Sequence, residues 1–162
     1  MVDIQTVSIA IASASVVAGV VYYALQLRHQ NKVRQTDLVI RLSSDIRRKE
    51  FLEAVMGVYE AEFKDYGDFV KKYGTPFSRN RVPLSFLMVG NFFEQLGILL
   101  RNRLIDDYLI SQLFPTSVMW EKMKPVVEGI RKEYHGPQYY EWFEYLYNEM
   151  KKREQKLQQS KI

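Results

Sequence analysis

The amino-acid sequence predicts an all-α protein, in which one N-terminal transmembrane helix continues into a polar stalk and then a bundle of about five or six helices. Three observations predict this class. A long uncharged apolar run opens the chain, apolar residues recur at helical spacing in later segments, and no strand-like alternation or internal repeat is present. We expect four parts: an anchor (1–27), a helical stalk (28–42), a bundle domain (43–150) and a charged C-terminal tail (151–162).

The predicted anchor contains a run from Ile4 to Leu27, which holds 24 residues without Asp, Glu, Lys or Arg. As a helix it would be about 36 Å long, which exceeds the ~30 Å hydrocarbon core of a bilayer. Two alternatives remain open. A cleaved signal peptide would need a basic start, which Met1–Asp3 does not supply, and a shorter apolar core. A buried helix of a soluble core usually keeps a polar stripe.

Positive charge gathers on the C-terminal side of the predicted span. Asp3 is the charged residue before the run, whereas Arg28, Lys32 and Arg34 follow it. Because positive flanks stay in the cytoplasm, we expect these three residues at the inner leaflet, in contact with membrane lipid. The chain is therefore predicted to be a single-pass protein of the cell membrane, with its N-terminus outside and its C-terminal domain cytoplasmic.

Small residues recur at every fourth position of the span. Ala10, Ala14 and Ala18 form one row, and Ser15 and Gly19 form another. Such rows let two helix backbones approach closely within a membrane. We therefore expect a homo-oligomer or a protein partner at this face. The alternative is that Ala and Ser simply fill a weakly hydrophobic span.

The segment after the span favours a helix that crosses solvent. Arg28–Asp37 contains one apolar residue, Val33, and neither Gly nor Pro, so nothing in it ends a helix. Ser, Ser and Asp at positions 43–45 are good N-cap types and indicate a fresh helix start nearby. The next helix is expected to turn one apolar side inward: Phe51, Leu52, Val55, Val58, Tyr59 and Phe63.

The most apolar helix of the soluble part is predicted at Pro83–Leu104. A turn at Asp65–Asp68, a short helix ended by Gly74, and a loop at Thr75–Val82 precede it. Apolar residues cover most of its circumference, which is typical of the central helix of a bundle. A second span is the alternative, which Glu94 in the middle of the helix disfavours.

Two glycines of this helix, Gly90 and Gly97, lie seven positions apart and therefore share a face. We expect another helix to pack closely there. Glu94 and Arg101 fall on nearly the same face, and we expect them to form a buried polar pair. A buried carboxylate could act as a switch or proton carrier, although a purely structural pair is the plainer interpretation.

The last third of the chain predicts three more helices. Asp106 should cap the first, Pro115 should open the second, and Pro125 should kink or divide that second helix. A turn at His135–Pro137 precedes a last helix that runs from near Pro137 to about Gln159. One stripe of the last helix is rich in aromatic residues: Tyr139, Trp142, Phe143, Leu146 and Met150.

Composition argues against several classes of function. The chain has no Cys, and hence neither disulfides nor thiolate metal sites. All 23 basic and 18 of the 19 acidic residues follow Leu27 and are mixed rather than arranged as a basic stripe, so we expect no nucleic-acid partner. His29 and His135 lack metal-ligating neighbours at helical spacing, and neither G-x-S-x-G nor a phosphate-binding glycine loop is present. We therefore expect no enzyme and no catalytic, cofactor-binding or metal-binding residues.

Three segments carry a resemblance to a known family: DIQTVSIAIASASVVAGVVYYALQLRHQNKVRQTDLVIRL, NFFEQLGILLRNRLIDDYLISQLF and WEKMKPVVEGIRKEYHGPQYYEWFEYLYNEMKKREQKL. In these segments the chain resembles an uncharacterised archaeal and bacterial family of small single-span membrane proteins with a cytoplasmic helical domain. That family is described only as a domain of unknown function. The resemblance implies the topology given above and supplies no catalytic or binding residues.

Two functions follow as hypotheses. The first is a membrane-anchored cytoplasmic helical module for interaction or scaffolding. The second is a small-molecule or lipid sensor, with its pocket in the aromatic-rich bundle between the central and last helices. A sensor requires a sizeable cavity with a few convergent polar groups, whereas a scaffold requires a filled core and an exposed apolar patch or a large interface between chains.

Overall fold

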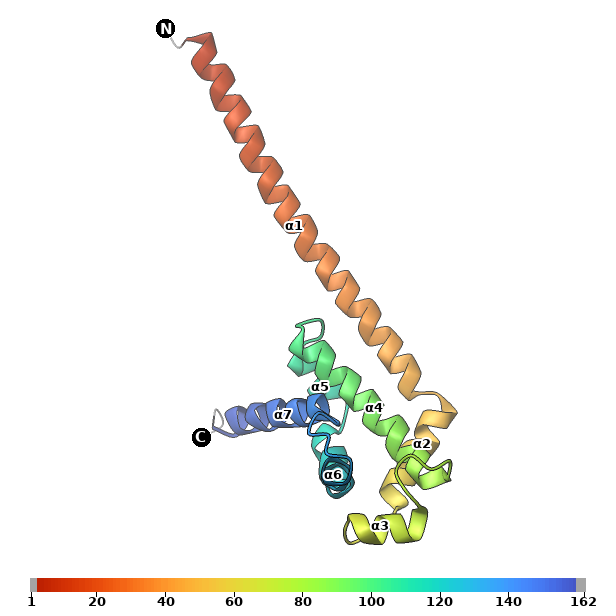
Figure 1. Ribbon diagram of the computed structural model, residues 1–162. Coiled ribbons are helices and arrows are strands. Elements are labelled where there is room, and N and C mark those ends of the chain that lie inside the picture. Colours follow the sequence, from red (N-terminus) through yellow and green to blue (C-terminus); the bar gives the residue numbers. More distant parts are fainter. Residues whose placement is uncertain (1–2, 160–162) are drawn as a thin grey trace. The chain divides into compact units, whose positions relative to one another are not determined.

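The computed structural model describes residues 3–159, and these form seven α-helices and no strand (Figure 1). The side chains of Thr6, Val7 and Ala10 also lie outside the described set. The helices are α1 (Ile4–Ile46), α2 (Lys49–Glu60), α3 (Tyr66–Tyr73), α4 (Arg81–Arg101), α5 (Asp107–Leu113), α6 (Thr116–Glu133) and α7 (Glu141–Gln159). The predicted all-α class is confirmed. The chain divides into two compact units, Met1–Ile40 and Arg41–Ile162.

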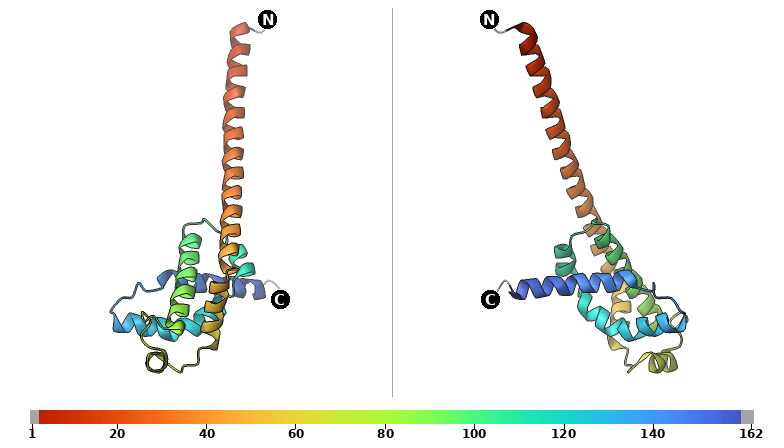
Figure 2. Two further views of the ribbon diagram at one scale, coloured as in Figure 1. Left: turned by 90° about the vertical axis from the view of Figure 1, so that its right-hand side faces the viewer. Right: turned by 60° about the vertical axis from the view of Figure 1, so that its left-hand side comes forward.

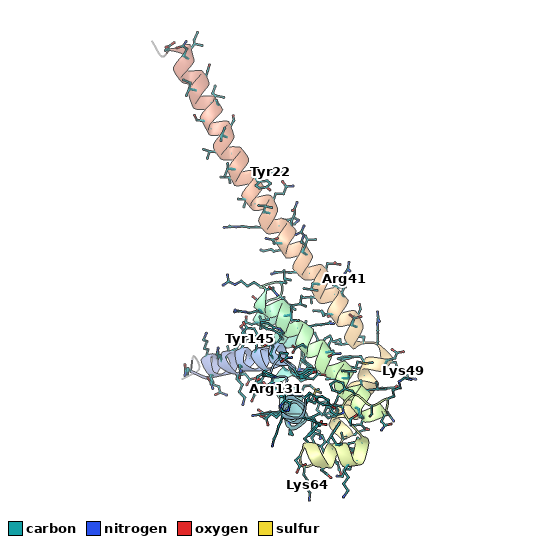
Figure 3. All side chains as sticks on the ribbon, viewed as in Figure 1. Tyr22, Arg41, Lys49, Lys64, Arg131 and Tyr145 are labelled. Carbon is teal, nitrogen blue, oxygen red and sulfur yellow. The ribbon has the colours of Figure 1, made fainter. Side chains whose placement is uncertain are left out.

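The first unit contains α1 up to Ile40, and the last turns of this helix belong to the second unit. The helix α1 has 43 residues and continues without interruption from the predicted span through the predicted stalk. Its stretch Ile11–Ile46 contains a window that is long and apolar enough to cross a membrane, and none of that window is buried. Figure 3 shows side chains such as Tyr22, which is 68% exposed, projecting from the helix. The apolar window of α1 is therefore not a core segment of this chain, whereas Leu42, near the C-terminal end of α1, is buried.

The hydroxyl groups of α1 find their hydrogen-bond partners within the helix. Ser8 Oγ donates to the carbonyl oxygen of Ile4, and Ser15 Oγ donates to that of Ile11, each at 2.9 Å. In a membrane a polar group has no water to bond, so such internal pairing makes Ser tolerable in a span. The weak hydrophobicity of this run is therefore compatible with a bilayer.

The break between α1 and α2 lies slightly later than predicted. Residues 43–45 belong to the last turn of α1, and the backbone N–H groups of Arg47 and Arg48 bond the carbonyl oxygens of Ser44 and Asp45 at 3.2 and 3.3 Å. Arg48 occupies the N-cap position of α2 without a side-chain cap. The predicted fresh helix start is confirmed, but the predicted capping residues end α1 and do not begin α2.

The helix α4 lies at the centre of the second unit, as predicted. It contacts α2, α6 and α7, and it buries Phe86, Val89, Phe93 and Leu96. Figure 2 shows α2 and α4 side by side. The helix is also long and apolar enough to cross a membrane, but half of its apolar window is buried inside the protein. This burial fits the predicted core helix.

Small residues of α2 allow it to lie close to α4. The buried residues of α2 are Ala54, Gly57 and Val58, and a Cβ added at Gly57 would lie 2.6 Å from Ser85 Oγ. The predicted inward side of α2 is therefore partly wrong, because Leu52 is 52% exposed and Tyr59 is 40% exposed. Only a small side chain fits at Gly57, where the two backbones approach closely, and Leu52 and Tyr59 turn outward. Phe51 still packs on Phe92 of α4, with ring centroids 4.8 Å apart.

The predicted close packing at Gly90 and Gly97 is confirmed. A Cβ added at Gly90 would lie 2.7 Å from Cε1 of Tyr140, and a Cβ at Gly97 would overlap the carbonyl oxygen of Trp142. Both neighbours belong to the segment that begins α7. The two glycines thus allow this segment to lie directly on the backbone of α4.

Several predicted helix ends are correct. Gly74 ends α3 with a φ of 92°, and Asp106 caps α5 by accepting from the N–H of Tyr108 at 2.7 Å. The predicted turn at Asp65–Asp68 is wrong, because α3 begins at Tyr66 and Asp65 caps it by accepting from the N–H of Asp68 at 2.9 Å. Two further predictions need correction. Pro125 does not divide α6, and α7 begins at Glu141 rather than near Pro137. Tyr140, with a φ of 56°, cannot continue a right-handed helix.

Candidate functional site

The described residues that are predicted to act in the membrane lie on the exposed surface of α1. Ala14, Ser15, Ala18 and Gly19 are exposed, and a Cβ added at Gly19 would meet no atom within 4 Å. The side chain of Ala10 lies outside the described residues. The predicted lipid flank, Arg28, Lys32 and Arg34, is exposed as well. These four small residues are therefore accessible to a second helix, and the role of the two rows stays a prediction.

The side chain of Glu94, in the middle of α4, caps the N-terminus of α7. Its Oε2 accepts a hydrogen bond from the backbone N–H of Phe143 at 2.8 Å, and the N–H of Trp142 also bonds this carboxylate. The first N–H groups of a helix have no partner within the helix. A carboxylate at this place satisfies them and interacts favourably with the positive end of the helix dipole.

Burial is the larger influence on the acidity of Glu94. It raises the pKa of the half-buried carboxyl above its usual value, and the N–H groups of Phe143 and Trp142 oppose part of that rise. Burial and the nearby Glu94 also raise the pKa of the Tyr140 hydroxyl to about 12. Tyr140 therefore stays protonated at neutral pH. The cluster stabilises the junction between α4 and α7.

The predicted polar pair between Glu94 and Arg101 is not formed. Glu94 bonds the start of α7, whereas the exposed guanidinium of Arg101 lies over the ring of Tyr145, 5.9 Å from its centroid. The physical reason is that backbone N–H groups at a helix start offer fixed donors close to the carboxylate. A flexible Arg near the end of α4 instead reaches outward to the next turn of α7.

Arg131 holds the end of α6 against the start of α7. Its Nε donates to the carbonyl oxygen of Tyr139 at 2.8 Å, and its Nη1 contacts Glu144 Oε2 at 2.6 Å. The side chain of Arg131 is 19% exposed, so this ion pair is better shielded from water than the surface pairs of the chain. Arg131 and Glu94 together fix the turn that sequence reasoning placed at His135–Pro137.

The aromatic core between the central and last helices is filled. Phe93 and Phe143 stack with centroids 4.7 Å apart, and Trp120 meets Phe143 edge-on at 5.0 Å. A cavity at the side of this core, lined by Met123 and Tyr140 among others, has a volume of only about 10 Å³. This is about the space of one water molecule. A sensor pocket between the central and last helices stays a prediction.

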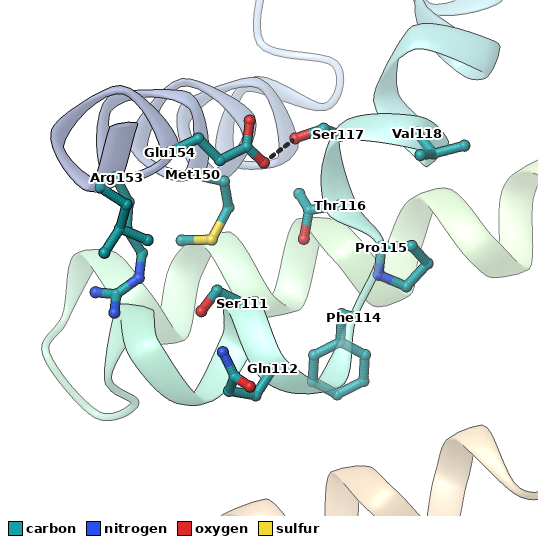
Figure 4. Close-up of a pocket in the computed structure, with 11 residues that line it drawn as sticks. Ser111, Gln112, Phe114, Pro115, Thr116, Ser117, Val118, Met150, Arg153 and Glu154 are labelled. Atoms are coloured by element: carbon teal, nitrogen blue, oxygen red, sulfur yellow. Dashed lines mark hydrogen bonds between the residues drawn. The ribbon is translucent and has the colours of Figure 1, made fainter. Parts of the chain in front are cut away.

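A larger pocket, of about 320 Å³, lies between α5, the start of α6 and the second half of α7 (Figure 4). Its volume is at the lower end of the range for small-molecule sites. Phe114, Pro115, Val118 and Met150 give it an apolar lining, and polar side chains complete it. The lining residues are Ser111, Gln112, Phe114, Pro115, Thr116, Ser117, Val118, Met150, Arg153, Glu154 and Leu157.

Charged groups around this pocket are already paired. Arg153 Nη1 contacts Asp107 Oδ2 at 2.9 Å, and Ser117 Oγ donates to Glu154 Oε1 at 3.2 Å. Within the described chain the hydroxyl of Thr116, a residue only 2% exposed, has no hydrogen-bond partner. Sequence reasoning missed this pocket because three separate elements build it. The one local signal was Pro115-Thr116-Ser117, which it assigned only to a helix start.

Among residues 3–159, no three His, Cys, Asp or Glu side chains come together in a group that could hold a metal ion. Surfaces of the described chain that are open to a partner or ligand include the exposed length of α1, the outward side of α2 and the pocket beside α6.

Comparison with known proteins identifies the family. The model of the family described as "Domain of unknown function (DUF4760)" matches residues 10–150, which is most of the chain. Neither a search of curated proteins nor a search of solved structures finds a match. The matched region runs from within α1 to the second half of α7, so it includes the long helix and the core of the bundle. The chain belongs to this family, DUF4760, whose function is unknown.

Proposed function

We propose that this chain is a membrane-anchored helical interaction module, with α1 as a single span and the bundle as a cytoplasmic binding domain. One observation carries the proposal: the chain pairs a helix whose apolar window is wholly exposed with a bundle whose core comes mainly from the later helices. The buried residue of α1 is Leu42, which lies after the predicted span, so the span itself contributes no described side chain to that core. Exposed apolar surface of the length of α1 is unfavourable in water and favourable in a bilayer.

The charges that flank the apolar part of α1 support the proposed orientation. Arg28, Lys32 and Arg34 are exposed on α1, and an excess of such residues marks the cytoplasmic side of a span. Asp3 is the charged residue on the other flank. The N-terminus would then face outward.

Labelling of introduced cysteines tests the orientation, since the chain has none of its own. We would compare D3C and Q159C in intact cells with a membrane-impermeant maleimide. D3C should react in intact cells, and Q159C should react only after the membrane is permeabilised. Labelling of Q159C in intact cells, with protection of D3C, would reverse the proposed topology. Secretion of the chain into the medium with label on Q159C and none on D3C would favour a cleaved leader, because cleavage removes position 3.

A sensor remains a second candidate because of the pocket beside α6, which has the size of a small ligand site and an unpartnered buried hydroxyl at Thr116. Native mass spectrometry of the full chain in detergent tests it. A retained small molecule that is lost in the cavity-filling variant S111F supports the sensor. A chain that carries no additional mass, or one that keeps it in S111F, argues against it.

A further inference from the structure

The outward side of α2 carries an apolar stripe that nothing in the described chain covers. Leu52 and Met56 are each 52% exposed and Tyr59 is 40% exposed. Their spacing of four and then three residues places them along one face of a helix. This face lies away from the small residues that contact α4. The helix is therefore apolar on two sides, and the core of the bundle uses only one of them.

Charged residues border this stripe in an ordered way. At about 100° per residue, Lys49, Glu53 and Glu60 fall along the same edge of the stripe. Lys49 is at the first residue of α2 and Glu60 at the last. Their positions differ by about 16 Å along the helix axis. Figure 3 shows Lys49 projecting outward from the start of the helix. This edge of α2 thus carries a positive charge at the N-terminal end of the helix and a negative charge at the C-terminal end.

This arrangement is complementary to itself when two copies of α2 pack antiparallel. In an antiparallel pair, the same edge of each helix meets, so the first residue of one copy lies near the last residue of the other. If Leu52 of one copy packs on Met56 of the other, Lys49 comes beside Tyr59 and Glu60 of the second copy. The two-fold symmetry creates two identical pairs of this kind.

We propose that the outward face of α2 is an isologous docking surface for a second copy of this chain, with Leu52 and Met56 at its centre and Lys49–Glu60 ion pairs at both ends. The inference rests on the proposed function, because it names the partner of the anchored module. The present contact of Lys49 does not oppose it. Lys49 Nζ lies 3.7 Å from Glu53 Oε1 with 85% of the Lys49 side chain exposed, which is a weak surface pair.

The apolar patch on α2 is small, so we expect two copies to associate through it only when a membrane confines them. Three partly exposed side chains offer an area on the order of a few hundred Å², well below the roughly 1,200 Å² that specific free complexes usually bury. Confinement of two copies in one membrane raises their effective concentration and allows a small interface to form. Association should therefore depend on the density of the protein in the membrane and decrease on dilution in detergent.

An anionic lipid surface is the main competing occupant. Arg47, Arg48 and Lys49 precede the stripe and would favour it. However, Glu53 and Glu60 lie along the edge of the stripe itself, and both would be repelled by anionic head groups. A second copy gains from the opposite charges of Lys49 and Glu60 at the two ends, which outnumber the single Glu53–Glu53 approach at the middle of this edge. An anionic membrane gains from the basic residues alone.

Charge reversal in the full chain, reconstituted in liposomes, tests the pairing. Donor and acceptor dyes on Q159C report self-association by energy transfer at a fixed ratio of protein to lipid. K49E and E60K should each reduce association about fivefold, because like charges then meet at both ends. The double variant K49E/E60K should return to within about twofold of the original. A mixture of K49E with E60K should also associate, because every cross pair is then opposite in charge.

Matched variants separate the explanations. Glu at the start and Lys at the end of a helix both suit the helix dipole, so neither reversal should unfold α2. K71E, a reversal of an exposed lysine in α3, should leave energy transfer unchanged.

Single reversals that have no effect while the original chain still associates would overturn the α2 surface and leave the anchored module intact. If the single reversals abolish self-association and neither the mixture nor the double variant restores it, the face binds another occupant, and the proposed α2 docking surface is also overturned. An E60K variant that binds anionic liposomes more tightly without self-association would assign the face to lipid. A chain that fails to enter liposomes would refute the proposed function itself.

Discussion

Replacement of Glu94 by Ala should destabilise the bundle more than replacement by Gln. Ala removes the acceptor of the N–H groups of Phe143 and Trp142, and a helix cap is worth about 0.5–2 kcal/mol. A half-buried donor left unpaired adds to this loss. We expect E94A to lower the free energy of unfolding by about 2 kcal/mol. Gln keeps an acceptor oxygen, and E94Q should lie within about 0.5 kcal/mol of the original at pH 7.

The dependence of the free energy of unfolding on pH follows from the direction of the Glu94 pKa shift. The folded state raises the pKa of Glu94, so the folded chain binds a proton more tightly than the unfolded chain does. The stability that this group contributes is present at low pH, and it is lost as the pH rises from the unfolded pKa through the raised folded pKa. The decrease should be absent in E94Q, because an amide does not titrate in this range.

Urea unfolding of the full chain in detergent, followed by tryptophan fluorescence, measures these effects. The chain has two Trp residues, Trp120 in α6 and Trp142 at the start of α7, so the signal reports on the bundle. E128A, which removes an exposed carboxylate of α6, is the matched control and should change the free energy of unfolding by less than about 0.5 kcal/mol. An E94A variant no less stable than E128A would refute the capping role. So would an E94Q variant as unstable as E94A.

Three further substitutions test local features by the same unfolding measurement. G97A should lower the free energy of unfolding by about 1–3 kcal/mol, because its Cβ overlaps the Trp142 carbonyl, whereas G19A in α1 should leave it unchanged. R103G should raise it by about 0.5–1 kcal/mol, because Arg103 ends α4 with a φ of 57° that glycine adopts without strain. D106A should lower it by about 1 kcal/mol through loss of the α5 cap. For G97A, R103G and D106A, a change of the opposite sign in the free energy of unfolding would contradict the role given to that residue.

The sequence predicted features that depend on local pattern. The faces of α4 that pack closely were predictable, because Gly90 and Gly97 lack side chains at a helical repeat. The Asp106 cap was predictable too, because its partner lies two residues away. The outward direction of Leu52 and Tyr59 could not be predicted, because hydrophobicity does not tell which of two apolar sides of α2 faces the core.

Features that depend on distant contacts could not be predicted in this way. The partner of Glu94 is a backbone N–H group 49 residues later in the chain, and no residue type encodes a backbone donor. The pocket beside α6 draws its lining from α5, α6 and α7, so no single segment displays it. The delayed start of α7 depends on the left-handed backbone of Tyr140, a conformation that a non-glycine residue rarely adopts.

Extraction of membranes at alkaline pH addresses the role of α1 most directly. Cells that express the full chain are lysed without detergent, washed with sodium carbonate and centrifuged at high speed. A chain held by α1 should stay in the pellet through the wash and enter the supernatant only with detergent. If it is released by lysis alone, α1 does not span a bilayer, and the anchored module is wrong.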